Sequence, residues 1–102
     1  MTRRPAKKPR AALVLCLYVA GESPNSVLAK TNLRLALAHL PKQSVTLEIR
    51  DVLSDPDRAS QDGVLVTPTL IKRFPEPQQR LIGNLRNSAL LAQLALAGVP
   101  SD

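Results

Sequence analysis

The stretch Leu17–Ser26 reads LYVAGESPNS, and it joins an apolar run to a helix-start signal. The apolar run begins at Leu13 and stops at Gly21. Ser23 is a residue type that caps helices, and Pro24 suits the first helical turn because the missing N–H leaves no bond unmade there. The stretch therefore predicts a buried strand that feeds a helix through a short turn.

Redox proteins of the thioredoxin type carry a Cys-x-x-Cys motif at such a turn. Here the turn has no cysteine, and the single cysteine of the chain, Cys16, lies inside the apolar run. We expect Cys16 to be a small buried core residue and not a nucleophile. A single cysteine excludes an intrachain disulfide and a cysteine-based zinc site within one chain.

Charge is distributed unevenly along the 102 residues, which suit one domain. The net charge is +6, but residues 11–102 contain nine basic and eight acidic residues. The other five basic residues all lie in the first ten positions: Arg3, Arg4, Lys7, Lys8 and Arg10. We expect residues 1–10 to be a solvated, disordered arm, with binding of nucleic acid or of an acidic partner as the alternative that is not favoured.

Membrane insertion is not expected, because no run approaches the roughly 20 apolar residues of a spanning helix. The basic N-terminus is not followed by a small-residue cleavage site, so we expect a cytoplasmic protein. The expected organisation is an arm over 1–10, one domain over 11–99 and a short tail over 100–102.

The first half of the chain predicts a strand, a helix and a second strand. Apolar residues three or four positions apart predict a helix over Pro24–Leu40, which Pro41 ends. Val45–Arg50 alternates apolar and polar residues and carries charges, so we expect a half-buried strand at a sheet edge. A strand, helix and strand in this order predict parallel neighbouring strands.

The second half predicts a short helix, Pro56 to about Gln61, capped by Ser54 or Asp55. Strands are expected over Thr69–Phe74 and Gln79–Ile82. Pro68 interrupts the strand-like sequence, and we expect its peptide bond with Thr67 to be cis.

A loop over residues 84–86 is expected to lead into a last helix, Ala89 to about Ala97, which Asn87 or Ser88 caps. The complete order is β-α-β-α-β-β-α. It is the order of the thioredoxin-like α/β fold, with a mixed four-stranded sheet.

Four motifs in register between about residues 12 and 96 resemble the KaiB family of circadian clock proteins. Leu17–Val27 resembles the opening of that family, and Asp51–Leu53 with Pro56 resembles its middle. Val66–Leu70 reads VTPTL, and Arg80–Leu85 resembles the family's Arg-Ile-Ile-Gly-Asp-Leu.

The resemblance implies a non-enzymatic protein without metal or cofactor that binds the hexameric ATPase KaiC. It also implies KaiA-like proteins or a histidine kinase of the SasA type as further partners, and a homo-oligomer, dimer or tetramer, in at least one state. The family is metamorphic, and its other fold is a tetrameric β-α-β-β-α-α-β form. That form needs a strand near residues 87–94, where Ser88–Leu94 favours a helix, so we expect the thioredoxin-like state.

Three departures from the family pattern stand out. Leu28 replaces the arginine that usually follows Ser-Val, Gln79 replaces the first of two paired arginines, and Asn84 replaces an aspartate. The first two lost charges belong to surfaces that the family uses in clock complexes, which puts tight KaiC binding in question.

Candidate partner-binding residues are polar or charged and predicted to be exposed, and each of them is open to the alternative of being solvated surface. They are Glu22, Asn25, Lys42, Thr46, Glu48, Arg50, Arg58, Lys72, Arg73 and Arg80. Residues expected to shape the fold or its switching are Gly21, Pro24, Pro68, Gly83 and Asn84. Asp51, Asp55, Asp57 and Asp62 do not have the spacing of a calcium loop, and we interpret them as helix caps and solvated faces.

Overall fold

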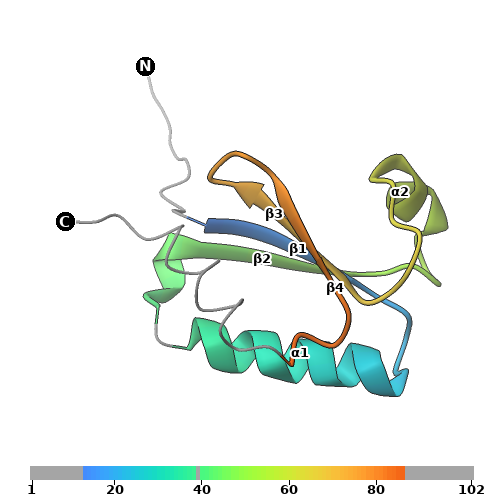
Figure 1. Ribbon diagram of the computed structural model, residues 1–102, viewed down its shortest axis with the longest axis horizontal. Helices are drawn as coiled ribbons and strands as arrows, with labels where there is room; N and C mark the ends of the chain where they lie inside the picture. The colour runs from blue at the N-terminus through green and yellow to red at the C-terminus, as the bar shows by residue number, and fades with distance from the viewer. Residues whose placement is uncertain (1–12, 39, 87–102) are drawn as a thin grey trace.

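Strands and helices alternate in the computed structural model, which describes residues 13–38 and 40–86. In chain order the elements are β1 (Leu13–Val19), α1 (Pro24–Leu37), the 3-10 helix η1 (Lys42–Ser44), β2 (Val45–Asp51), α2 (Pro56–Gln61), β3 (Thr69–Phe74) and β4 (Gln79–Ile82) (Figure 1). The predicted order is confirmed through residue 86. The expected last helix, and residues 87–94 on which the choice of fold depended, lie outside the described residues.

The four strands form one mixed sheet with the order β2-β1-β3-β4. β1 pairs with β2 in parallel and with β3 in antiparallel orientation, and β3 and β4 form an antiparallel hairpin. Leu17 at the centre lies opposite Ile49 on one side and Leu70 on the other. The prediction that β2 is an edge strand parallel to β1 is therefore confirmed for the described part of the chain.

The two faces of the sheet are covered unequally (Figure 1). α1 runs along one face and buries alternate β1 residues, including Leu15 and Leu17, against Ala29 and Leu33. The shorter α2 lies on the opposite face, where Cys16, Tyr18 and Ile71 pack against Ala59. The alternation within β1 sends neighbouring residues to opposite faces, so both faces of this strand are buried.

The turn between β1 and α1 has a glycine with positive φ, Gly21 at +53°. Asp51 closes the turn, because its Oδ1 accepts hydrogen bonds from the backbone N–H of Gly21 (3.1 Å) and of Leu53 (2.9 Å). Ser23 occupies the N-cap position, but the prediction that its side chain caps the helix is wrong. Its hydroxyl bonds the buried Ser26 hydroxyl instead (2.8 Å).

α1 ends at Leu37, three residues before the predicted end. The N–H of Ala38 bonds to the carbonyl of Leu35, and that of Leu40 to Leu37, so each bond spans three residues and tightens the last turn. Pro41 accounts for this ending, because a proline offers no N–H to the carbonyl four residues before it, here that of Leu37, and its ring clashes with that carbonyl. The 3-10 helix η1 that follows was not predicted.

The Thr67–Pro68 peptide bond is cis, as predicted, and so are the bonds that precede Pro75 and Pro77. The bounds of α2, β3 and β4 agree with the predicted ones, and Asp55 caps α2 by accepting a hydrogen bond from the N–H of Arg58 (3.3 Å). Local signals were sufficient for these elements because a proline or a capping residue marks most of their starts.

Candidate functional site

The predicted partner-binding residues are spread over several parts of the molecule. Three of them lie on β2, on the side of the sheet that faces away from α1. Val45, Leu47 and Ile49 of this strand pack against the core under α1. The alternate residues, Thr46, Glu48 and Arg50, therefore point to the opposite side, and we call them the edge face.

An ion-pair network joins the edge face to α2. The Arg50 guanidinium lies 2.5 Å from a Glu48 carboxylate oxygen and 3.2 Å from Asp55, the N-cap of α2. Thr46 is exposed, whereas Glu48 and Arg50 are half-buried. The edge face is thus a polar surface held in place at one end by α2, with Lys42 exposed in η1 at the beginning of the strand.

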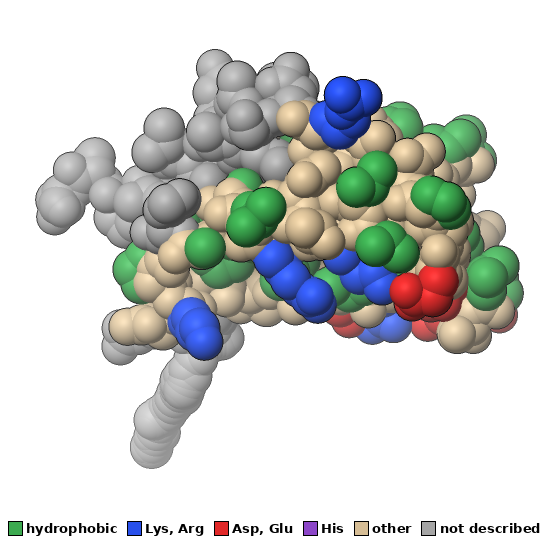
Figure 2. Space-filling view, turned by 90° about the horizontal axis from the view of Figure 1, so that it is seen from below, with side chains coloured by type: hydrophobic (Ala, Val, Ile, Leu, Met, Phe, Trp, Pro, Cys, Tyr) green, Lys and Arg blue, Asp and Glu red, His purple; other side chains and the backbone are tan. Residues whose placement is uncertain are grey.

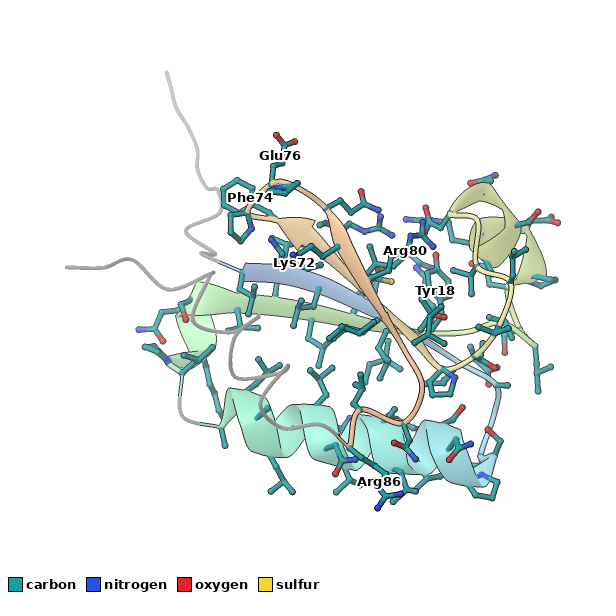
Figure 3. The ribbon with its side chains drawn as sticks, in the orientation of Figure 1. Tyr18, Lys72, Phe74, Glu76, Arg80 and Arg86 are labelled. Atoms are coloured by element: carbon teal, nitrogen blue, oxygen red, sulfur yellow. The ribbon has the colours of Figure 1, made fainter. Side chains whose placement is uncertain are left out.

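A second group of polar side chains surrounds Asp62, just after α2. The Tyr18 hydroxyl donates to the Asp62 carboxylate, and the Arg73 guanidinium lies 2.7 Å from the same carboxylate oxygen. Arg80 donates from β4 to the Asp62 backbone carbonyl. Figure 3 shows Tyr18 and Arg80 reaching the space between the sheet and α2. We call these four residues the Asp62 cluster, and they connect β1, β3 and β4 to the turn after α2.

Burial and hydrogen bonding shift the pKa values within this cluster. Burial, followed by the hydrogen bond to Asp62, raises the pKa of Tyr18 to about 12. The hydrogen bond from Tyr18, joined by that from Arg73, lowers the pKa of Asp62 below its ordinary value. Desolvation also raises the pKa of the buried Cys16 thiol, which disfavours the reactive thiolate.

Sequence reasoning predicted Arg73 and Arg80 as surface cations but missed Tyr18 and Asp62 as their partners. The Tyr18–Asp62 contact spans 44 residues of sequence, so no local pattern could find it. One signal was available: a tyrosine in an otherwise apolar strand needs a partner for its hydroxyl.

Lys72 does not contribute to an exposed surface. Its side chain is 2% exposed, and its ammonium donates hydrogen bonds to the carbonyls of Pro75 and Pro77 (3.1 Å for Pro77). The expectation that it meets an acidic partner is therefore wrong. The alternation of side chains along β3 explains this burial. Lys72 pairs with Leu15 on the face that α1 covers, whereas Arg73 points to the opposite face.

Of the remaining candidates, Arg58 lies half-buried on α2, and the other two lie around the start of α1. Glu22 forms an exposed ion pair with Lys30 (3.6 Å), and Asn25 accepts a hydrogen bond from the Asn84 side chain (3.2 Å). The Asn84 carbonyl in turn accepts one from Asn32 (2.9 Å). Asn84 thus attaches the loop after β4 to α1, and this loop begins at Gly83, whose φ is +112°.

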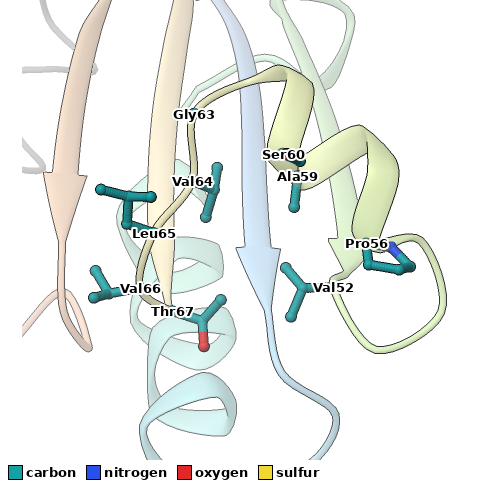
Figure 4. A pocket seen from close by; sticks show the side chains of 9 residues that line it. All are labelled: Val52, Pro56, Ala59, Ser60, Gly63, Val64, Leu65, Val66 and Thr67. Atoms are coloured by element: carbon teal, nitrogen blue, oxygen red, sulfur yellow. The ribbon is translucent and has the colours of Figure 1, made fainter.

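An open groove of about 370 Å³ lies between α2 and the segment that leads to Pro68 (Figure 4). Its lining is mostly apolar and includes Val52, Ala59 and Val64. Its nine lining residues carry no titratable side chain. Over residues 13–38 and 40–86 there is no group of three or more His, Cys, Asp or Glu side chains that could hold a metal ion. Within the same residues no helix is long and apolar enough to cross a membrane.

Comparison with protein families gives a match over residues 16–96 to the KaiB domain. The circadian clock oscillator protein KaiB of Prochlorococcus marinus is 47% identical over 77 residues, which are 76% of this chain and 66% of that protein. The protein of the same name from Thermosynechococcus vestitus is 46% identical over 78 residues, 76% of this chain and 72% of that one. The matched region is thus about two thirds of the length of these relatives.

Solved structures agree on the architecture. The N-terminal domain of SasA from Synechococcus elongatus superposes with a TM-score of 0.70, at 24% identity, over 95% of this chain and 90% of that domain. A thioredoxin from Halobacterium salinarum gives a TM-score of 0.71, at 18% identity, over 90% and 80% of the two chains. At these identities the similarity establishes the fold, which is thioredoxin-like as predicted.

Proposed function

Because the chain belongs to the KaiB family, we propose that it is a non-enzymatic regulatory protein that docks on a KaiC-type ATPase, in circadian timing or stress adaptation. Identity of about 46% to clock oscillator proteins over three quarters of the chain is the observation that supports this role most directly. The relatives' names place those proteins in the circadian clock, and their docking partner is carried over here as part of the proposal.

The edge face is the surface we propose for docking. β2 pairs with β1 on one side only, and no other described strand lies beside it. The free backbone groups of an edge strand can accept a partner strand. Lys42 lies before the strand, and Arg58 lies on α2, the helix whose N-cap Asp55 pairs with Arg50. These two cations favour an acidic partner.

The test is complex formation with the cognate KaiC-type ATPase, measured by size-exclusion chromatography after short and long incubation. Long incubation matters because a minor binding-competent state delays association. We expect a complex with the natural chain and at least about tenfold weaker binding after the double change Lys42→Glu and Arg58→Glu. The control is Glu76→Lys, a charge reversal at an exposed residue between β3 and β4, at the edge of the sheet opposite β2. Failure to form a complex in either nucleotide state of the ATPase contradicts the proposal.

Further partners are part of the same proposal. A KaiA-like protein or a histidine kinase of the SasA type would compete for or share the docking surface, and the chain would form a dimer or tetramer in one of its states. Sedimentation of the isolated chain over a range of concentrations measures whether a dimer or tetramer forms.

A thioredoxin-like redox function is the alternative, and the environment of Cys16 argues against it. The thiol lies in the middle of β1, is 1% exposed and has a raised pKa. A nucleophilic cysteine instead needs a lowered pKa and access to substrate. Cys16→Ser tests this alternative, which predicts the loss of any reductase activity that the natural chain has.

A further inference from the structure

The outer side of α1 carries apolar residues that the other described residues, within 13–38 and 40–86, leave exposed. Leu28 is 45% exposed and Leu35 is 65% exposed, and seven positions separate them. Thr31, which lies between the two leucines, and Ala38, which follows Leu35, are also exposed. Residues spaced 3-4-3 fall on one line of a helix, as the a and d positions of a heptad do. We call Leu28, Thr31, Leu35 and Ala38 the α1 seam.

The α1 seam lies opposite the part of the helix that packs on the sheet. Ala29 and Leu33 are buried in the core, and Leu33 follows Leu28 by five positions, which places it about 140° away around the helix axis. Packing on the sheet therefore does not explain the two exposed leucines.

Positively charged side chains lie on both flanks of this seam, and one of them, Lys30, pairs with Glu22 at the start of α1. Between Glu22 and Glu48 the sequence has no acidic residue. Arg34 lies on one flank of the seam by its helical position, and Lys30 lies beyond it. Arg86 lies beside α1 from the other direction, after the loop that Asn84 attaches to the helix (Figure 3). Figure 2 shows hydrophobic side chains on this side of the molecule with Lys and Arg side chains on either side of them.

We propose that the α1 seam is a second protein-binding surface, which accepts an amphipathic helix with acidic residues beside its apolar stripe. A helix with leucines at a and d would cover Leu28 and Leu35, with the small Thr31 and Ala38 leaving room for its side chains. Its acidic residues would face Arg34 on one flank and Arg86 on the other. Both arginines are available for such contacts, because no carboxylate among the described residues forms an ion pair with them.

Two other occupants fit the charges less well. A second copy of this chain, packed antiparallel, would bring Arg34 close to Lys30 of the other copy, and a parallel arrangement would bring the two Arg34 side chains together. A membrane surface is usually bound by a broad apolar face with aromatic residues, whereas the α1 seam is narrow and α1 contains no aromatic residue.

The probe is a labelled synthetic peptide of about three heptads with Leu at a and d and Glu at e and g, which repels itself and stays monomeric. A matched peptide has Lys in place of each Glu. Fluorescence anisotropy with the full chain should give a dissociation constant for the Glu peptide at least about tenfold lower than for the Lys peptide. The double change Leu28→Ser and Leu35→Ser should abolish this difference, and Arg34→Glu should reduce it. Leu65→Ser, at a leucine that is 93% exposed on the α2 side, should leave it unchanged.

Equal binding of both peptides, or binding that survives the double leucine change, overturns the proposal. A dimer of the natural chain that the leucine change dissociates assigns the seam to a second copy and also overturns it. Binding to anionic vesicles that the double leucine change removes also overturns the proposal. The Lys42→Glu and Arg58→Glu variant should bind the Glu peptide as the natural chain does. Loss of peptide binding at the α1 seam can therefore be distinguished from loss of docking on the ATPase.

Discussion

Tyr18 links the two halves of the chain through its side chain. It lies in an apolar strand and is fully buried, yet its hydroxyl reaches a carboxylate 44 residues further along the sequence. A buried hydroxyl without a partner costs about 1–3 kcal/mol, so Asp62 satisfies a requirement that the strand sequence creates.

The ionisation of Tyr18 can be measured directly because the chain has one tyrosine and no tryptophan. We expect its phenol to titrate near the folded pKa of about 12 and, in denaturant, near its ordinary value of 10. Asp62→Asn should bring the folded pKa part of the way back, since the carboxylate is its second cause after burial. Near-ultraviolet absorbance of the phenolate is the measurement. A folded chain whose phenol titrates at the ordinary value contradicts the buried hydrogen bond.

At this scale the sequence predicted the environment of some single residues, but it did not predict which side chains contact one another. Cys16 is buried and Pro68 is cis, as predicted, because each follows from its own neighbours in the strand. The burial of Lys72 and the Asp62 cluster could not be predicted, since they depend on strand register and on contacts over long sequence separations. Asp62 precedes Gly63 and has the appearance of an ordinary exposed turn.

At the scale of elements, most boundaries could be predicted because prolines and capping residues mark them. The end of α1 and the 3-10 helix η1 could not, since the apolar spacing of α1 continues to Leu40 while Pro41 ends the helix earlier. The candidate surfaces were only partly predictable. The edge face follows from alternation in the strand, but the exposure of Leu28 and Leu35 depends on how much of α1 the rest of the domain covers.

The turns that connect elements offer a paired test of backbone strain. Gly21 and Gly63 both have positive φ, +53° and +70°. An added Cβ at Gly21 would also lie 3.3 Å from the Leu53 side chain, whereas at Gly63 the nearest atom is the end of the Arg80 side chain at 3.9 Å. We expect Gly63→Ala to lower the free energy of unfolding by about 1 kcal/mol and Gly21→Ala by somewhat more, about 1–2 kcal/mol. Urea unfolding of the two variants measures both values, and equal losses would show that the contact with Leu53 is relieved without cost.

For the whole molecule, Asp62 makes stability depend on pH. Its pKa is lower in the folded chain than its ordinary value of 3.8, so its contribution is present above that value and is lost as the pH falls through the folded pKa. We expect the free energy of unfolding to decrease on acidification below about pH 4.

Asp62→Asn should remove this part of the pH dependence and lower stability near pH 7 by about 2 kcal/mol, because the charged acceptor of two hydrogen bonds is lost. The control is Asp57→Asn, an exposed acid in the first turn of α2. Urea titrations at several pH values compare the three chains. The same acid dependence in wild type and Asp62→Asn would assign it to other carboxylates.

The position of β1 between β2 and β3 also determines what a hydrogen-exchange experiment can report. Along a central strand the amide protons alternate between the two neighbours, so β1 carries one set bonded toward β2 and another bonded toward β3. Deuterium uptake at the first set records opening of the N-terminal strand-helix-strand unit, and uptake at the second records detachment of the β3–β4 hairpin. The two exchange rates measured along this one seven-residue strand therefore show which half of the molecule opens more readily.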